Sequence, residues 1–204
     1  PMIPILKKLS KRTKVLLIGI LALFFLWHLA SGVLVKRLNY TYYAQSSQII
    51  YDRNGQVIQI SPNQKGYYNQ FLKDTPENLK EPLLKKEDRF FYWHPGINPL
   101  SLLRGGWNWV VSGKRQGSST INQQLAKILI GQENNRTLFN KLEETWYALA
   151  LEWRLNKNEI FIMYLNSAYF GRQAQGLKAA SQYYFNAQPE NLTQAQILSL
   201  IASL

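Results

Sequence analysis

Residues 87–96 of this chain read EDRFFYWHPG, and residues 117–127 read GSSTINQQLAK. The first stretch predicts the end of a short helix, because a Pro-Gly pair does not continue one. The second predicts the start of a helix, because Thr120 and Gln123 have the spacing of a capping box. The first helix would therefore carry a pair of carboxylates near its end, before the His-Pro-Gly turn that stops it, and the second would begin with hydroxyls, two amides and a lysine.

Glu87 is the candidate general base of the first stretch. Adjacent helical residues point about 100° apart, so Glu87 can face a substrate while Asp88 caps a helix or pairs with a neighbour. The aromatic run at 90–93 would supply the partly apolar surroundings that suit a base. The alternative, and the commoner role of two adjacent carboxylates, is a solvated acid pair neutralised by the basic residues at 85, 86 and 89. His94 is then only part of a turn that stops the helix.

The second stretch is a candidate anion site. Free N–H groups at a helix N-terminus, with the helix dipole behind them, bind phosphate oxygens. Lys127 lies four positions after Gln123 on the same face and adds a positive charge, and Arg136 follows in a predicted loop. The alternative is an ordinary capped amphipathic helix with solubilising charges. No metal site is predicted from spacing, because the chain has no Cys and its two histidines lie in separate parts of the sequence.

Residues 15–35 contain no Asp, Glu, Lys or Arg. At about 1.5 Å per residue, a helix of this length crosses the roughly 30 Å hydrocarbon core of a bilayer. Five basic residues precede the run and only Lys36 and Arg37 follow it closely, so the positive-inside rule predicts a cytoplasmic N-terminus. A cleaved signal peptide is the alternative, but the run is long for one and no small-x-small site follows it directly.

These observations predict a basic cytoplasmic tail at 1–14, a transmembrane helix at 15–35, a stalk at 36–48 and one domain at 49–204. The uncapped apolar end at 197–204 and the first residue, Pro1, suggest a segment of a longer protein. The net charge of +12 is unevenly placed: seven of the 24 basic residues lie in the first 37 positions, which contain no acid. The remainder has a net charge of only +5, so a nucleic-acid binder has little support.

The domain is expected to be mainly α with one β-hairpin. Strand-like runs at 48–51 and 56–60 flank an Asn-Gly turn, the strongest short hairpin signal. A helix is expected from Glu81, with Pro82 in its first turn, to the His-Pro-Gly turn. Further apolar periodicity predicts helices over 100–111, 120–129, 139–155, 158–164, 176–184 and 193–204.

Taken together, the motifs resemble glycosyltransferase family 51, the peptidoglycan transglycosylase domain of class A penicillin-binding proteins. The resemblance runs from about Tyr51 to Leu204. It covers EDxxFxxHxG at 87–96, GxSTxxQQxxK at 117–127, the segment from Arg136 to Glu144, and the later motifs at 151–152, 157–166 and 170–185. The stretches HPGINP at 94–99 and LEW at 151–153 are most similar to the penicillin-binding protein 1C subgroup.

The resemblance implies a lysozyme-like bilobal fold, with its cleft beside the outer face of the bacterial cytoplasmic membrane. It implies polymerisation of lipid II into β-1,4 glycan strands by an inverting reaction that releases undecaprenyl pyrophosphate. Glu87 is the implied general base, and Glu144 is the second catalytic carboxylate. The implied substrate-binding residues are Asp88, His94, Ser119, Thr120, Gln123, Gln124, Lys127, Arg136 and Lys141. No cofactor is expected, although a divalent cation such as Mg²⁺ or Mn²⁺ can accompany a pyrophosphate. The implied partners are lipid II, the nascent glycan strand, the membrane and other cell-wall synthesis proteins.

Three positions depart from the family pattern: Ile128 replaces an Asn, Asn140 an Arg, and Gln196 a Glu. Loss of the arginine removes a possible phosphate contact, so the affinity of the site for the donor substrate is not determined by the motifs. The departures also keep a non-enzymatic, membrane-anchored cell-wall scaffold as an alternative. A membrane-tethered muramidase or lytic transglycosylase is the other alternative. Hydrolysis, however, pairs two carboxylates across the sugar and needs no anion site for its leaving group, so the lysine-bearing helix and Arg136 favour the transferase.

Overall fold

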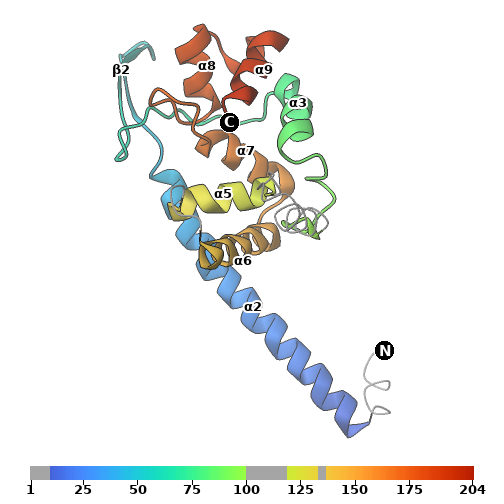
Figure 1. Ribbon diagram of the computed structural model, residues 1–204. Coiled ribbons are helices and arrows are strands. Elements are labelled where there is room, and N and C mark those ends of the chain that lie inside the picture. Colours follow the sequence, from blue (N-terminus) through green and yellow to red (C-terminus); the bar gives the residue numbers. More distant parts are fainter. Residues whose placement is uncertain (1–9, 100–118, 133–136) are drawn as a thin grey trace.

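The computed structural model describes residues 10–99, 119–132 and 137–204, and the expected helix over 100–111 lies outside them. The described chain is mainly helical with one β-hairpin, and one long helix, α2 (Lys11–Tyr43), projects from the remainder (Figure 1). Both the mainly α class and the small hairpin agree with the sequence prediction.

Helix α2 has two parts with different surroundings. Its mean hydropathy reaches 2.2 over an 18-residue window, and it is long and apolar enough to cross a membrane. Most side chains over 15–26 are exposed, whereas Ser31, Val35, Leu38 and Tyr42 are buried against the domain. Residues 36–43, part of the expected stalk, therefore continue the same helix and contribute to the core.

The hairpin pairs β1 (Gln48–Tyr51) with β2 (Val57–Ser61) in antiparallel register, with an irregularity between Ile50 and Tyr51. One carboxylate oxygen of Asp52 accepts hydrogen bonds from two backbone N–H groups of the turn, at 2.8 and 2.7 Å. Gly55 has a φ of +81°, which an L side chain rarely adopts. The predicted turn chemistry is thus present.

Helix α3 (Glu77–Glu87) differs from the prediction at both ends. It begins four residues earlier than expected, after Pro76, so Pro82 lies inside it rather than in its first turn. Leu79 and Leu83, each 1% exposed, anchor its apolar face, and α3 packs on α9 (Gln194–Ala202). The helix ends at Glu87, before the aromatic run, because Asp88 leaves helical geometry with a φ of −160°.

The domain is built around α5 (Ile121–Ile130), which packs against α6 (Leu138–Arg154) and α7 (Lys157–Ser167) (Figure 1). Helix α8 (Leu177–Phe185), the short helix η1 (Pro189–Asn191) and α9 form the end of the domain farther from the start of α2. The α-helices α5 to α9 agree with the predicted ranges to within a few residues, whereas η1 was not predicted. Three of them begin with the same device: capping boxes start α5 at Thr120, α7 at Asn156 and α9 at Thr193.

Candidate active site

Glu87 lies at the end of α3, where a side chain of α5 holds its carboxylate. The Gln124 amide donates a 3.0 Å hydrogen bond from Nε2 to Glu87 Oε2. The Tyr164 hydroxyl of α7 donates to the Oε1 of the same amide at 3.1 Å. The other carboxylate oxygen, Oε1, lies 3.3 Å from the Lys86 ammonium, and the Glu87 side chain is only 15% exposed. The carboxylate is therefore oriented by a chain of hydrogen bonds that reaches the core.

Glu87 and Tyr164 together fix which way that amide points. Burial, and then the nearby negative charge of Glu87, raise the pKa of the Tyr164 hydroxyl above its usual value of 10.0, so the hydroxyl keeps its proton. A phenol can donate or accept a hydrogen bond, but a carboxylate can only accept one. The NH₂ group of Gln124 therefore faces Glu87, and its oxygen accepts from Tyr164.

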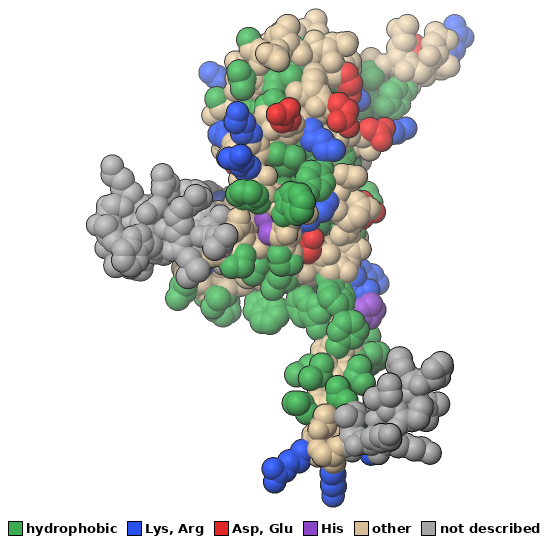
Figure 2. Space-filling model, turned by 90° about the vertical axis from the view of Figure 1, so that its right-hand side faces the viewer, with side chains coloured by type: hydrophobic (Ala, Val, Ile, Leu, Met, Phe, Trp, Pro, Cys, Tyr) green, Lys and Arg blue, Asp and Glu red, His purple; other side chains and the backbone are tan. Residues whose placement is uncertain are grey.

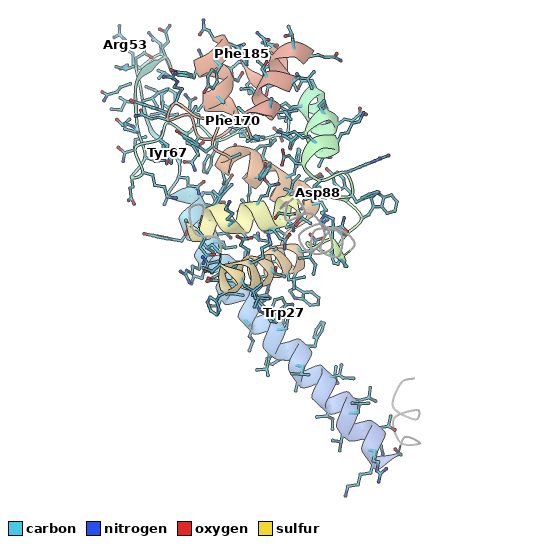
Figure 3. All side chains as sticks on the ribbon, viewed as in Figure 1. Trp27, Arg53, Tyr67, Asp88, Phe170 and Phe185 are labelled. Atoms are coloured by element: carbon cyan, nitrogen blue, oxygen red, sulfur yellow. The ribbon has the colours of Figure 1, made fainter. Side chains whose placement is uncertain are left out.

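Asp88 and His94 form a buried pair that fixes the start of α5. Asp88 is labelled in Figure 3, close to one end of α5. His94 Nε2 lies 2.8 Å from Asp88 Oδ2, and the same oxygen accepts the backbone N–H of Ile121 at 3.0 Å. A negative side chain is favourable there, because the first N–H groups of a helix have no partner inside it. Both residues are buried, each only 7% exposed. Each is therefore held by partners within the chain, independently of any contact with substrate.

The His-Pro-Gly turn is held against the same helix start. The Thr120 hydroxyl, besides capping α5, donates a 2.7 Å hydrogen bond to the carbonyl of Gly96. A Cβ atom on Gly96, whose φ is +83°, would lie 2.8 Å from the carbonyl oxygen of Ala148. Glycine is required at this position because the turn lies directly on α6.

The second predicted carboxylate belongs to a neighbouring cluster. Lys141 Nζ lies 2.8 Å from Glu144 Oε2 and 2.8 Å from the Ser119 hydroxyl. Gln123, fully buried, bonds Thr145 at 3.2 Å, and Thr145 in turn donates to the backbone carbonyl of Lys141. Adjacent amides of α5 thus reach the two carboxylate regions: Gln124 contacts Glu87, and Gln123 contacts the residue after Glu144.

Lys127 is half-buried one turn after Gln124, on the same side of α5. Within the described ranges its ammonium group has neither a hydrogen bond nor an ion pair, unlike those of Lys86, Lys141 and Lys157. It is therefore available for an external anion. Arg136 lies outside the described residues, so its predicted place in the site is not tested.

Four polar side chains that support the site were not predicted as part of it. Tyr164 is one. The others form a cluster behind the His-Pro-Gly turn: Lys157 Nζ lies 2.8 Å from both Glu152 Oε2 and the His94 carbonyl, and Asn122 donates to Glu152 at 3.0 Å. All four lie in segments whose sequence resembles the family. Their roles could not be predicted from the sequence, because each side chain bonds a partner on another helix or turn, and such contacts leave no regular spacing along the chain.

The three departures from the family pattern have structural explanations in part. Ile128 packs against the hydrophobic core. Gln196 accepts the backbone N–H of Thr193 at 2.8 Å, so the amide performs the capping that a carboxylate would perform. The backbone N–H of Asn140 bonds the Thr137 hydroxyl that caps α6, as that of any residue there would, so this contact does not explain the replacement of the arginine.

Comparison with known proteins agrees with this geometry. Residues 54–204 match the family model described as Transglycosylase. Penicillin-binding protein 1C of Escherichia coli (strain K12) is 39% identical over 130 residues, which are 63% of this chain and 17% of that protein. Penicillin-binding protein 1F of Bacillus subtilis (strain 168) is 33% identical over 181 residues, 88% of this chain and 24% of that protein. Penicillin-binding protein 1A of Rickettsia prowazekii (strain Madrid E) is 33% identical over 159 residues, 76% of this chain and 20% of that protein.

The chain spans only about a fifth of the length of these relatives. Within that part, the family match includes Glu87, all of α5 and Glu144. The chain belongs to the transglycosylase family and carries the transglycosylase domain of the class A penicillin-binding proteins.

Proposed function

We propose that this domain polymerises lipid II into β-1,4 glycan strands. Glu87 accepts the proton of the 4-hydroxyl group of the acceptor's GlcNAc, and that oxygen attacks the anomeric carbon of the donor MurNAc. The bond from this carbon to the pyrophosphate oxygen breaks, and undecaprenyl pyrophosphate leaves with its electron pair. Attack from the face opposite to the leaving group inverts the anomeric configuration.

The observation that carries this proposal is the hydrogen-bond chain from Tyr164 through Gln124 to Glu87. A base is effective only when its lone pair is held towards the proton that it removes. The chain orients Glu87 from two helices, α5 and α7, and leaves the carboxylate partly accessible, with 15% of its side chain exposed. A surface acid paired only with neighbouring lysines would have no such support.

The leaving pyrophosphate is assigned to the cationic side chains of α5 and the segment that follows. Lys127 supports this assignment because its ammonium has no partner within the described part of the chain. It would neutralise charge that develops on the phosphate oxygens in the transition state, with Arg136 beside it. Lys141, held by Glu144, and the polar side chains of the α5 start would bind the sugars and phosphates around them.

No cofactor is required in this scheme. Among the described residues there is no group of three or more His, Asp or Glu side chains that could hold a metal ion. A Mg²⁺ or Mn²⁺ ion that accompanies the pyrophosphate of the substrate is compatible with this scheme.

We place the domain on the outer face of the bacterial cytoplasmic membrane, with α2 crossing the bilayer and the N-terminus inside. The hydropathy and length of α2 support a span, and the basic residues before position 15 support this orientation. Such an anchor would confine the base to the depth at which a lipid-linked sugar is displayed, which raises the effective concentration of substrate. The nascent strand and other cell-wall synthesis proteins would be its partners.

The test is glycan synthesis from purified lipid II by the full chain in detergent, with Glu87→Gln as the variant. The amide keeps the size of the carboxylate but accepts no proton at neutral pH, so polymer formation should fall by about 10²-fold or more. Glu190→Gln, on the exposed η1, is the matched control and should retain full activity. Undiminished synthesis by the Glu87 variant would refute its role, and release of fragments from intact peptidoglycan would point to a lytic enzyme instead.

A further inference from the structure

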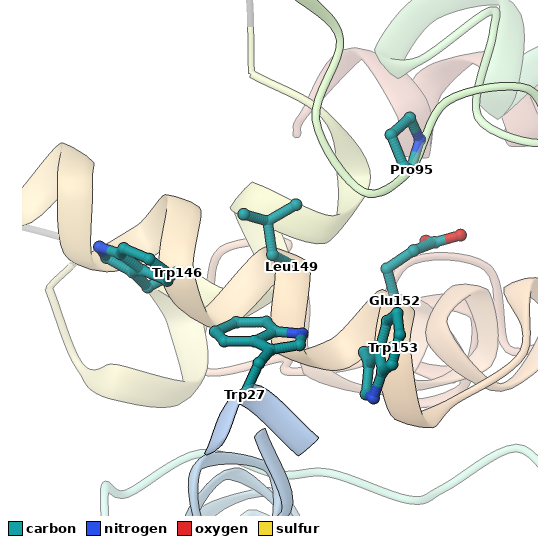
Figure 4. Close-up of a pocket in the computed structure, with 6 residues that line it drawn as sticks. All are labelled: Trp27, Pro95, Trp146, Leu149, Glu152 and Trp153. Carbon is teal, nitrogen blue, oxygen red and sulfur yellow. The ribbon is translucent and has the colours of Figure 1, made fainter. Parts of the chain in front are cut away.

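The open cavity beside α2 offers a ligand mainly apolar contact. It has a volume of about 220 Å³ and lies between α2, α6 and the His-Pro-Gly turn (Figure 4). Three tryptophan rings line it, and Glu152, the charged side chain among its described lining residues, is already paired with Lys157. Figure 2 shows further hydrophobic side chains on the surface where α2 meets the domain. A cavity of this kind gives little indication of a specific ligand.

A cavity of different chemistry lies at the other end of the domain, where β2 and the loop after it meet α8 (Figure 1). Its volume is about 180 Å³. Its wall combines aromatic rings, amides and one cation, which belong to Tyr68, Gln70, Arg172, Gln182 and Tyr183. None of the described residues that line it is acidic. A ligand would therefore meet a positive charge that the wall itself does not neutralise.

Arg172 reaches the cavity from a backbone turn of uncommon conformation. Gly171, Arg172 and Gln173 have φ angles of +86°, +50° and +62°, so three successive residues are left-handed. Residues with a Cβ atom rarely adopt this conformation, because the Cβ atom comes too close to the carbonyl oxygen that follows. Such residues persist only where their surroundings fix them, and they are concentrated at binding and catalytic sites. The conformation of the turn thus indicates a functional site at this cavity.

The surroundings of the turn hold it from two sides. The Gln173 carbonyl accepts the backbone N–H of Tyr68 at 2.8 Å, and the Tyr68 carbonyl accepts that of Gln175 at 3.0 Å. From the other side, the Tyr184 hydroxyl of α8 donates to the Phe170 carbonyl at 2.9 Å. The backbone that carries the cation is therefore fixed relative to both walls of the cavity.

The Arg172 guanidinium is available to a ligand. It is exposed, and within the described part of the chain it has neither a hydrogen bond nor an ion pair. The Arg154 guanidinium, by contrast, donates to the Ser31 hydroxyl at 3.0 Å. A guanidinium presents its N–H groups in a fork that matches the two oxygens of a carboxylate. A carboxylate is therefore the anion that this side chain suits best.

The other groups of the wall suit a peptide better than a sugar. The Gln70 amide has no hydrogen bond within the described ranges, so it can both donate to and accept from a peptide group. The faces of Tyr68 and Tyr183, which are 42% and 60% exposed, can cover small apolar side chains. A neutral sugar could stack on the same rings but would leave the Arg172 charge without a partner. At roughly 30 Å³ per water molecule the cavity holds about six waters, which is room for the end of a short peptide.

We propose that this cavity binds the carboxylate end of a short peptide attached to the glycan strand, with Arg172 as the residue that pairs with the carboxylate. The glycan strand as the source rests on the proposed function, whereas the preference for a peptide carboxylate rests on the cavity alone. The described lining shares no residue with the candidate active site. The peptide therefore belongs to a part of the strand away from the reacting sugars, and the cavity would hold the strand rather than take part in bond formation.

The test is a saturation-transfer NMR titration of the full chain in detergent, with acetyl-alanyl-alanine as the probe. The probe is made either from D-alanine, which peptidoglycan peptides contain, or from L-alanine, and its C-terminus is either free or amidated. We expect the D-peptide with the free carboxylate to bind in the millimolar range. Its amide should bind at least about tenfold more weakly, because a charge-assisted hydrogen bond is lost.

Arg172→Gln should weaken binding of the free D-peptide at least about tenfold, since it removes the positive charge from the cavity. Arg53→Gln, the same change at an exposed arginine in the turn of the hairpin, is the matched control and should bind the probe as the parent does. Thermal unfolding of both variants checks that the domain stays folded.

Equal binding of the acid and the amide, or of the probe by Arg172→Gln and the parent, would overturn the proposal. Tighter binding of the L-peptide would overturn it too, because the C-terminus of a protein would then be the better ligand, as would displacement of the probe by an equal concentration of inorganic phosphate. Glycan synthesis from lipid II is measured on the same protein. Polymer formation without peptide binding refutes this inference alone, whereas peptide binding without polymer refutes the proposed function and leaves the peptide site in place.

Discussion

The two faces of α6 are opposite to those of an ordinary surface helix: its largest apolar side chains lie on the exposed face rather than on the buried one. Of the buried residues of this helix, Glu144, Tyr147, Ala148, Ala150 and Leu151, only Tyr147 and Leu151 have large apolar or aromatic side chains. The outer face carries two tryptophans, a phenylalanine and a leucine that remain exposed. A helix that packs on a water-soluble domain normally turns its largest apolar side chains inwards.

The reason for the reversal lies in what each face contacts. The inner face must leave room for the Gly96 backbone, so a small residue, Ala148, lies there, and it must carry the Lys141–Glu144 pair beside Ser119. None of the described contacts joins the outer face to Gly96 or Ser119, so large side chains fit there. Through contacts with Trp27 and Phe24 it continues the apolar surface of α2. The same helix thus contacts the candidate active site on one side and keeps large apolar side chains exposed on the other.

The largest expected contrast is in stability. Leu151→Ala removes a fully buried side chain from the inner face, and should lower the free energy of unfolding by about 2–5 kcal/mol. Leu142→Ala on the outer face should change it by no more than about 0.5 kcal/mol, because this side chain is 55% exposed in the folded chain. Denaturant unfolding of both variants measures the contrast, and equal losses would mean that the outer face is packed against protein.

A second contrast concerns activity. Glu144→Gln removes the negative partner of Lys141 and frees its ammonium from the place beside Ser119, so the rate of glycan synthesis should fall by about 10²-fold. Glu143→Gln, one position earlier, alters a side chain that bonds only Gln132 among the described contacts and should remain within a few-fold of the parent. The initial rate with saturating lipid II decides between them. A comparable loss in both variants would remove the special role assigned to Glu144.

The smallest expected effect is a difference in pH dependence. The pKa of Tyr164 is raised in the folded chain from its usual 10.0, so above pH 10 the unfolded state releases a proton that the folded state keeps. The stabilisation is complete below pH 10 and is lost as pH rises further, by up to about 1.4 kcal/mol per pH unit. Tyr164→Phe should show a shallower decline in unfolding free energy between pH 9 and 11, while Leu142→Ala should follow the parent. Parallel curves for the Tyr164 variant would show that this hydroxyl does not stay protonated.

Local chemistry was predictable where it depends on near neighbours. The Asn-Gly hairpin, the capping box at Thr120 and the order of the later helices follow from residues within a few positions of one another. The end of α3 was wrong because its determinant is distant: Asp88 leaves the helix to accept the N–H of Ile121, 33 positions away. The predicted start at Glu81, with Pro82 in the first turn, was wrong because burial of Leu79 and Leu83 supports a longer helix around that proline.

The candidate site divides in the same way. Glu87, Gln124, Lys127 and Glu144 could be named as candidates because motif spacing and family resemblance mark them in the sequence, and their roles stay predictions. Tyr164 and the Glu152–Lys157–Asn122 cluster were not found, because a hydrogen bond between helices leaves no regular spacing in the sequence.

The sequence by itself determined that the chain is mainly helical, that it contains an apolar run long enough to span a bilayer, and that α6 is amphipathic. Periodicity and local capping decide these properties, because they depend on contacts within one or two helical turns. Only the tertiary structure decided which side of α6 is covered. Burial is a property of the partners that a helix meets, and here α5 and the His-Pro-Gly turn take the inner face while the tryptophans stay outside.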